Sequence, residues 1–443
     1  MQHSTTNTSG STTKTSGSTP NTSGWLALSP ALIFLTLYVI VSLVIGDFYV
    51  MPITVALMAA SAWSIAICRG AGKLSARVAL FSRSAGNADV LYMVWIFIMA
   101  GAFAALAKSI GAIDATVGVT LRFFPPSLLL PAIFAGACFI SMSIGTSVGT
   151  VVALVPLVVE IAYGAEGDVP LFVATVLGGA FFGDNLSFIS DTTIAATRTQ
   201  GCKMADKFRA NFRIVFPAAL ITLGLYIAIG SGVDYITHPT NTPWWLMTPY
   251  MFIIAAALAG VNVLIVLLGG IVIAIGFGLS QGISLLDSCR ILGEGVDSMG
   301  QLIIITVLAA GMLGMIKQMG GIDFMLRALT ARVSGKRGAQ ACISVLVGIV
   351  NLCTANNTVA ILTVGELSRD IAHRYGISAS KTASLLDTGS CIVQCLIPYG
   401  AQTLLATSLA GISPAAPWQY LYYPWALTLM LTVSILITRK RRA

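Results

Sequence analysis

The chain has 443 residues, of which 56% are hydrophobic and only 9% charged, and its mean hydropathy is +0.87. Soluble domains carry roughly 25% charged residues, so this composition excludes a water-soluble fold and indicates a polytopic membrane protein. The 25 basic residues outnumber the 17 acidic ones. They gather in a few segments between apolar stretches, which is typical of cytoplasmic loops and does not predict a nucleic-acid-binding stripe.

The N-terminal residues 1–24 are mostly Ser, Thr, Gly and Asn. Such a stretch cannot bury enough apolar surface to fold and predicts a disordered polar tail. The eight cysteines are scattered and the three histidines lie far apart, so no metal-binding or redox motif is predicted. We therefore expect no cofactor.

Membrane-spanning helices need about 20 apolar residues. Eight uninterrupted candidates follow in chain order: 28–46, 51–68, 90–107, 212–231, 248–263, 265–280, 300–316 and 420–438.

Four further apolar segments are interrupted by polar or glycine residues. Segment 129–163 is interrupted at 145–150, and segment 341–372 at 354–358. Each limb of these two has about 14–16 residues, too few to cross a bilayer comfortably at 1.5 Å per residue, so both are predicted to be re-entrant hairpins. Segments 170–197, with polar residues at 183–187 and 190–193, and 381–409, around Gln394 and Pro398, are predicted to be broken helices.

An internal repeat relates the two halves of the chain. A shift of about 210 residues aligns polar residues and glycines in order, as the following pairs show: Lys108 with Lys317, Gly111 with Gly320, Asp114 with Asp323, Glu160 with Asp370, and Thr197 with Thr407. Chance similarity between apolar segments would match Leu and Ala but rarely these residues. The chain is therefore divided into a first repeat (25–232), an extracytoplasmic linker (233–247), a second repeat (248–438) and a basic tail (439–443).

Loop charges predict the orientation of the repeats. Loops 69–89, 198–211 and 317–340 are basic and are expected in the cytoplasm, whereas loops 164–169 and 281–299 are acidic and are expected outside. This assignment gives each repeat about five crossings plus one hairpin. Because five is odd, the repeats must be inverted relative to each other, as in many secondary transporters. Both termini are then predicted to be cytoplasmic.

Oxygen-bearing residues gather at the interruptions. Broken helices in a membrane expose carbonyl groups and helix ends that can bind small cations, and oxygen ligands suit hard cations. The first-half candidates are Thr146, Ser147, Asp184, Asn185, Ser187, Ser190, Asp191 and Thr192. Acidic residues within the membrane are costly and usually functional, although close packing of small residues or capping of a half-helix would also explain this composition.

The second half offers mainly amides. The residues are Asn356, Asn357, Thr358, Gln394 and Gln402, with one carboxylate, Asp387, whose role stays open. The 210-residue shift places Asp184 opposite Gln394. A single charged site is the natural interpretation, with Na⁺ expected at Asp184, Asp191 and Ser147.

The two first-half motifs resemble those of a known family. The sequence GTSVGT at 145–150, followed by FFGDNLSFISDTT at 181–193 and preceded by ALAKSIGAIDAT at 105–116, is similar to the signature of NhaC-type sodium/proton antiporters. The resemblance spans nearly everything beyond the N-terminal tail. It implies a fold with paired hairpins and broken helices. It also implies a cation site formed by Thr146, Ser147, Asp184, Asn185, Ser187 and Asp191.

These observations predict a secondary transporter, not an enzyme, that exchanges Na⁺ for H⁺ across the cytoplasmic membrane. Competition of the two ions for one buried carboxylate suffices for exchange. The alternative is a Na⁺-coupled carrier of an amino acid or small organic acid, with 356–358 as its polar contacts. A channel or an intramembrane enzyme is disfavoured, because the sequence shows neither identical pore-lining repeats nor a nucleophile–base pair. The sequence leaves a homodimer open.

Overall fold

The computed structural model of the chain is built from helices. It describes residues 23–40, 52–112, 115, 125–187, 190–230, 243–259, 261–330 and 333–438, and no β-strand occurs among them. The predicted all-helical class is confirmed. The α-helices are α1 (Gly24–Leu35), α3 (Ile53–Ile67), α4 (Leu74–Ala85), α5 (Ala88–Ser109), α7 (Leu129–Ile144), α8 (Ser147–Gly164), α9 (Val169–Leu186), α10 (Asp191–Gln200), α11 (Met204–Gly230), α12 (Thr248–Leu258), α13 (Val263–Ser280), α14 (Leu285–Ser298), α15 (Gly300–Gln318), α16 (Gly321–Thr330), α17 (Gly335–Thr354), α18 (Asn357–Arg374), α19 (Ala379–Leu396), α20 (Ala401–Ala410) and α21 (Tyr422–Leu436).

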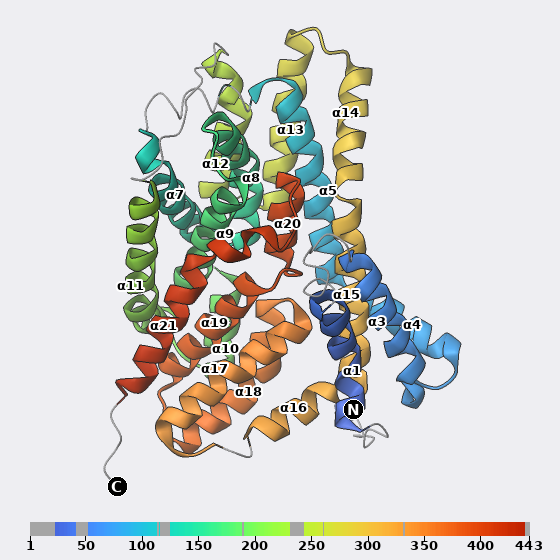
Figure 1. Cartoon of the computed structure of the whole chain (residues 1–443), viewed down its shortest axis with the longest axis vertical. Coiled ribbons are helices and arrows are strands. Elements are labelled where there is room, and N and C mark those ends of the chain that lie inside the picture. Colours follow the sequence, from blue (N-terminus) through green and yellow to red (C-terminus); the bar gives the residue numbers. More distant parts are fainter. Residues whose placement is uncertain are drawn as a thin grey trace, which may run out of the picture.

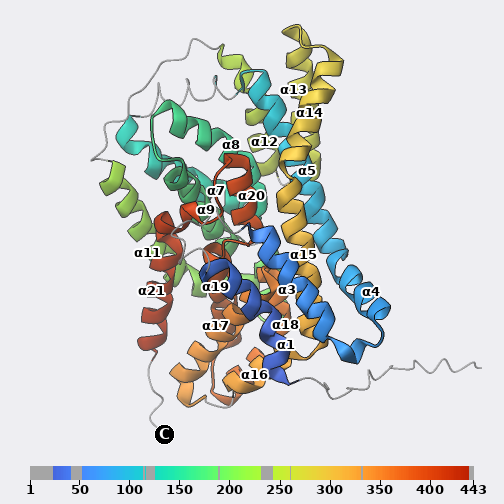
Figure 2. The same cartoon turned by 45° about the vertical axis from the view of Figure 1, so that its right-hand side comes forward.

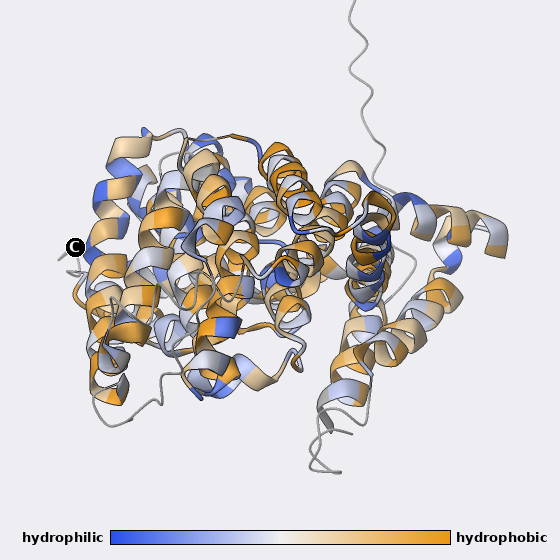
Figure 3. Ribbon diagram, turned by 90° about the horizontal axis from the view of Figure 1, so that it is seen from above, coloured by the Kyte–Doolittle hydropathy of each residue, from blue (hydrophilic) through white to orange (hydrophobic). Residues whose placement is uncertain are grey.

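The apolar helices identify a multi-pass membrane protein. Within the described residues, eight helical stretches are long and apolar enough to cross a bilayer, and further apolar helices are shorter. The predicted spans 90–107, 265–280 and 300–316 lie in α5, α13 and α15. Figure 3 shows hydrophobic residues along most of the helices, including those on the outside of the bundle. This distribution suits a lipid environment, in which apolar side chains need no cover.

Three segments predicted to be loops contain helices instead. Helix α4 lies within 69–89, α14 within 281–299 and α16 within 317–340. These helices are amphipathic, so a search for uninterrupted apolar runs misses them. Helix α14 packs along α5 through two glycines, since a Cβ atom on Gly101 would lie 2.3 Å from the carbonyl oxygen of Gly295. Figure 2 shows the two helices side by side.

The duplication is visible in the positions of the helix ends. Adding 210 to the bounds of α8, α9 and α10 gives the bounds of α18, α19 and α20. The turns agree as well. Gly145, between α7 and α8, and Ala355, between α17 and α18, are both left-handed, and each is followed by an extended residue. The predicted hairpin turns and helix breaks are confirmed.

The two halves of the chain interlock reciprocally. The short helix α20, from the second half, packs against α8 of the first hairpin, whereas α10, from the first half, packs against α18 of the second hairpin. Figure 1 shows α7, α8 and α20 in the upper part of the molecule and α17, α18 and α10 in the lower part. The two helix breaks therefore meet near the middle.

Several predictions about topology stay open. The number of crossings in each repeat, the inverted relation between the repeats and the orientation in the membrane remain predictions. The tail 1–24 and the linker 233–247 lie largely outside the described residues, and the basic tail 439–443 lies wholly outside them.

Candidate cation site

The first hairpin turns on a glycine. Gly145 ends α7 with φ 76° and ψ 19°, a left-handed conformation that glycine adopts without steric cost. Thr146 is extended, and α8 begins at Ser147. The side chain of Thr146 does not cap α8, so the first N–H groups of this helix need another acceptor.

Asp184 supplies that acceptor from the last turn of α9. Its Oδ1 atom accepts a hydrogen bond from the Ser147 backbone N–H at 3.1 Å, and its Oδ2 atom accepts one from the Ser147 hydroxyl at 2.5 Å. The side chain is buried, with 4% of the residue exposed. The carboxylate faces the positive end of the α8 dipole, where negative charge is stabilised. Helix capping, which the sequence offered as an alternative role, is thus seen here, but on α8.

The break between α9 and α10 adds two hydroxyl groups. Ser190 Oγ lies 3.4 Å from Asp184 Oδ1 and 2.9 Å from Thr192 Oγ1, and Thr192 donates to the backbone carbonyl of Asp184 at 3.3 Å. Both hydroxyls therefore lie beside the carboxylate.

The second half reaches the same point through amides. Gln402, in α20, donates from Nε2 to the Ser147 hydroxyl oxygen at 3.0 Å. Gln394, in α19, donates from Nε2 to Gln402 Oε1 and to the carbonyl of Ala355, both at 2.9 Å. A chain of hydrogen bonds thus joins the second hairpin turn to Asp184.

A cavity of about 210 Å³ adjoins these groups. Most of the predicted ligands line it, namely Thr146, Ser147, Asp184, Asp191, Thr192, Asn356, Asn357, Thr358 and Gln402, together with Ser190 and apolar residues of α5 and α18. Asp184 and Asp191 thus share one cavity wall with Ser147. Asn185, Ser187, Asp387 and Gln394 are not among the lining residues.

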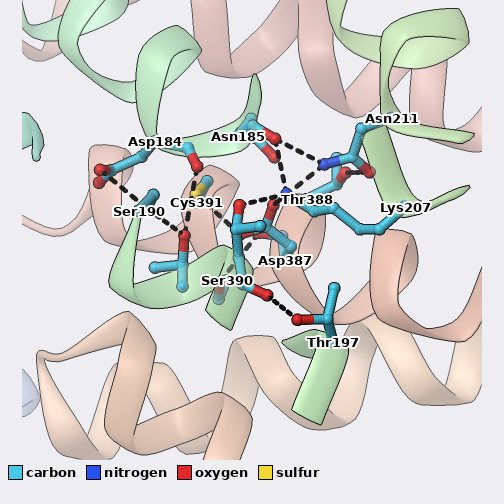
Figure 4. A network of polar contacts seen from close by, with 12 residues as sticks. Asp184, Asn185, Ser190, Thr197, Lys207, Asn211, Asp387, Thr388, Ser390 and Cys391 are labelled. Atoms are coloured by element: carbon cyan, nitrogen blue, oxygen red, sulfur yellow. Dashed lines mark hydrogen bonds and ion pairs between the residues drawn. The ribbon is translucent and has the colours of Figure 1, made fainter. Parts of the chain in front are cut away.

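Asp387 belongs to a second polar cluster, shown in Figure 4. Its Oδ2 atom forms an ion pair with Lys207 Nζ and accepts a hydrogen bond from Asn211 Nδ2 at 3.0 Å. The side chains of Lys207 and Asp387 are 1% and 0% exposed. Lys207 belongs to the segment 198–211, which the sequence predicted to be a basic cytoplasmic loop. For Lys207 this prediction is wrong, because α11 begins at Met204 and carries this side chain into the core.

Sequence reasoning missed both α11 residues, although a signal was present. Lys207 and Asn211 continue the buried face of α11 that runs through Ile214, Ala218 and Thr222. Residues three or four apart share a helix face. Extending this face backwards by two turns would have placed a lysine and an asparagine in the core.

The two polar clusters differ in whether their buried charges are paired. In the described part of the chain, the buried charged residues are Asp184, Lys207 and Asp387. Lys207 and Asp387 neutralise each other, and the remaining buried carboxylate is Asp184. Burial of a charge is costly unless an opposite charge or a proton neutralises it. Asp184, with hydroxyl and amide oxygens around one cavity, can accept either a proton or a hard cation.

This chain resembles known proteins over most of its length. A model of the Na⁺/H⁺ antiporter family matches residues 18–231 and 233–438. The Na(+)/H(+) antiporter NhaC of Bacillus subtilis is 26% identical over 74% of this chain and 79% of its own. The Malate-2H(+)/Na(+)-lactate antiporter of the same organism is 19% identical over 79% of this chain and 81% of its own.

A solved structure, that of the Alcanivorax borkumensis YdaH transporter, covers 82% of this chain and 89% of its own at 15% identity. Its TM-score of 0.41 is too low to support a conclusion about this fold. The family match extends over nearly the whole length, so the chain belongs to the Na⁺/H⁺ antiporter family.

Proposed function

We propose that this protein exchanges Na⁺ for H⁺ across the cytoplasmic membrane, and that Asp184 carries either ion. The observation that supports this most strongly is the single buried carboxylate without a cationic partner in the described structure, placed where two helix interruptions meet at a cavity. In the membrane interior this group favours a neutralised state. Na⁺ and H⁺ therefore compete for it, and binding of one displaces the other.

The residues around Asp184 have distinct tasks in this exchange. Ser147 and Ser190 orient the carboxylate, and Gln402 fixes the Ser147 hydroxyl from the other half of the chain. Thr192 and Asp191 line the cavity beside it and offer further oxygen ligands for Na⁺. Because both halves contribute to one site, a movement of one against the other would expose Asp184 to each side in turn, which is alternating access.

The proposal includes an orientation. The basic segments 69–89, 198–211 and 317–340 face the cytoplasm, in accordance with the charge bias of membrane proteins. The two repeats are then inverted, and the hairpins enter the bilayer from opposite sides, as their places in the upper and lower parts of Figure 1 suggest.

The test uses inside-out vesicles from bacteria that lack their own sodium/proton antiporters. A pH-sensitive dye follows the collapse of an imposed proton gradient when Na⁺ or Li⁺ is added. We expect the wild type to respond and Asp184→Asn to be inactive, because the amide cannot release a proton. Asp206→Asn, an exposed carboxylate in α11, is the matched control and should respond like the wild type. A wild type without any cation-dependent response over a range of pH would refute the proposal.

A second candidate function rests on the size of the cavity. A volume of about 210 Å³ exceeds the needs of a bare Na⁺, and one wall carries Asn356, Asn357 and Thr358 from the second hairpin. A small organic acid or amino acid could lie between this amide wall and the cation at Asp184. Na⁺-dependent uptake of a labelled carboxylate or amino acid into proteoliposomes would support this function. Proton-linked Na⁺ transport in the absence of any organic solute would show that transport does not require such a solute.

A further inference from the structure

The ammonium group of Lys207 is enclosed by oxygen atoms at the α9–α10 break (Figure 4). It donates to the backbone carbonyl of Asn185 at 2.7 Å and to Thr193 Oγ1 at 2.6 Å, and it forms the ion pair with Asp387 Oδ2. A lysine ammonium has three N–H donors and no acceptor. All three donors therefore have an oxygen partner, and the cation is held on both sides of the break and by α19.

These partners form a set that a metal ion would also use. A carboxylate, a carbonyl near the end of a helix and a threonine hydroxyl are typical oxygen ligands of hard cations, and carbonyls at helix C-termini attract positive charge. We propose that Lys207 is a tethered cation that fills a second cation site, made by Asn185, Thr193 and Asp387. The transported cation then binds only at Asp184, one ion in each cycle. This inference rests on the proposed exchange function.

Asn211 holds two ligands of this site in place through hydrogen bonds. Its Nδ2 group donates to the Asn185 carbonyl at 2.9 Å as well as to Asp387 Oδ2. The Asn185 carbonyl thus has two donors and is not available to a transported ion. We assign the backbone carbonyl of Asn185 to this second site, whereas its role as a ligand of the transported cation stays a prediction.

The arrangement occurs at the first helix break and has no counterpart at the second. The 210-residue shift places Lys207 opposite Pro417, Asn211 opposite Leu421 and Asp387 opposite Leu177. The first break therefore has a lysine where the second has none. A group that only stabilised the repeated fold would be expected in both halves, whereas a group that sets the number of bound ions is needed once.

The test measures Na⁺ binding and thermal stability of the purified full chain. Three variants are compared with the wild type: Lys207→Ala, the double variant Lys207→Met/Asp387→Asn, and Lys203→Ala, which removes an exposed lysine and is the matched control. Radioactive Na⁺ gives the number of ions bound per chain. The melting temperature is followed while methylammonium chloride replaces choline chloride at constant ionic strength. Methylammonium has the ammonium group of a lysine side chain but no covalent link to the protein.

We expect one Na⁺ per chain in the wild type, the control and the double variant, and two in Lys207→Ala. Methylammonium should raise the melting temperature of Lys207→Ala by several degrees and leave the other three unchanged. Lys207→Ala with one bound Na⁺ and no methylammonium response would overturn the inference, as would a wild type that binds two ions. If Lys207→Ala does not fold, the double variant decides: loss of its Na⁺ binding would place the pair in the transported-ion site.

Failure of the proposed function would give a different result. A wild type that binds no Na⁺ contradicts exchange at Asp184, yet the methylammonium response of Lys207→Ala would still report on the tethered cation. Na⁺ transport that is no longer coupled to proton movement in Lys207→Met proteoliposomes would instead make Lys207 the proton carrier and overturn the inference.

Discussion

Gly183, the residue before Asp184, sets the distance between α9 and α7. A Cβ atom at this position would lie 2.2 Å from the Ser141 side chain and 2.4 Å from its backbone carbonyl carbon, whereas ordinary contact begins at 3.4 Å. Part of this clash is with backbone, which cannot rotate away. We therefore predict that Gly183→Ala displaces α9 from α7 by about 1 Å, close to the difference between those distances.

The displacement acts directly on the candidate site. Asp184 follows Gly183, and its hydrogen bond from the Ser147 N–H is 3.1 Å long, so an added 1 Å exceeds hydrogen-bonding distance. Overpacking typically costs about 1–3 kcal/mol of folding stability. The loss of one hydrogen bond to a charged group costs about 1.5–3 kcal/mol. A loss of about 1.5–3 kcal/mol in binding free energy corresponds to Na⁺ binding that is weaker by roughly ten- to a hundredfold.

The prediction is measured with the dye assay and by thermal unfolding. Gly183→Ala should lower the melting temperature by about 2–10 °C and raise the half-saturating Na⁺ concentration at least tenfold. The matched control is Gly136→Ala, in α7, where an added Cβ atom meets nothing within 4 Å. This control should keep full transport and gain slightly in stability, by about 0.5–1 kcal/mol, because alanine favours the helix.

Two results would refute this reasoning. Wild-type transport by Gly183→Ala would show that the α7–α9 contact does not position Asp184. An equal loss in Gly136→Ala would show that the effect is a general response of α7 or α9 to an added methyl group.

Two further predictions concern the second half of the chain. Gln402→Ala removes the hydrogen bond to Ser147 Oγ. It should raise the half-saturating Na⁺ concentration about 2–10-fold in the dye assay, as expected for a neutral hydrogen bond of about 0.5–1.5 kcal/mol. The control Gln301→Ala, at an exposed position, should not change this concentration, and equal effects of the two variants would contradict a role of Gln402 at the cation site. Ala355 has φ 47°, which costs an L-residue about 1–2 kcal/mol, so Ala355→Gly should raise the melting temperature by about 1–3 °C. Ala360→Gly, within α18, should lower it instead, and a fall in both would mean that Ala355 is not strained.

The repeat made much of the fold predictable from the sequence. Polar and glycine interruptions of apolar segments located both hairpins and both helix breaks, and the helix ends of the structure repeat at the offset of 210 residues that the sequence shows. Amphipathic helices such as α14 were not predicted, because their charged faces interrupt the apolar pattern. The contact between Gly295 of α14 and Gly101 of α5 was not predictable either, because the two glycines are far apart along the chain.

The candidate site was predictable where its residues are close in sequence or related by the repeat. Ser147, Asp184 and Thr192 belong to motifs at the two interruptions, and broken helices in a membrane must line a cavity or be buried in protein. The Lys207–Asp387 pair was not predictable in the same way. Lys207 precedes the apolar face of α11 by two turns, so its sequence context is that of a loop residue. Its burial depends on Asp387, which lies on another helix.

The two hairpins show how one repeated backbone can give one charged site. Both turns combine a left-handed residue with an extended one, so the backbone prepares two equivalent helix N-termini. In the first, Asp184 caps Ser147; in the second, Asn356 caps its own helix through its side chain, and Gln394 bonds the carbonyl of Ala355. A carboxylate at the second turn, without a cationic partner, would add a further charge to neutralise in each crossing of the membrane. The amides of Asn356 and Gln394 satisfy backbone groups at the second turn without that charge, and Gln402 connects this turn to the charged one through Ser147.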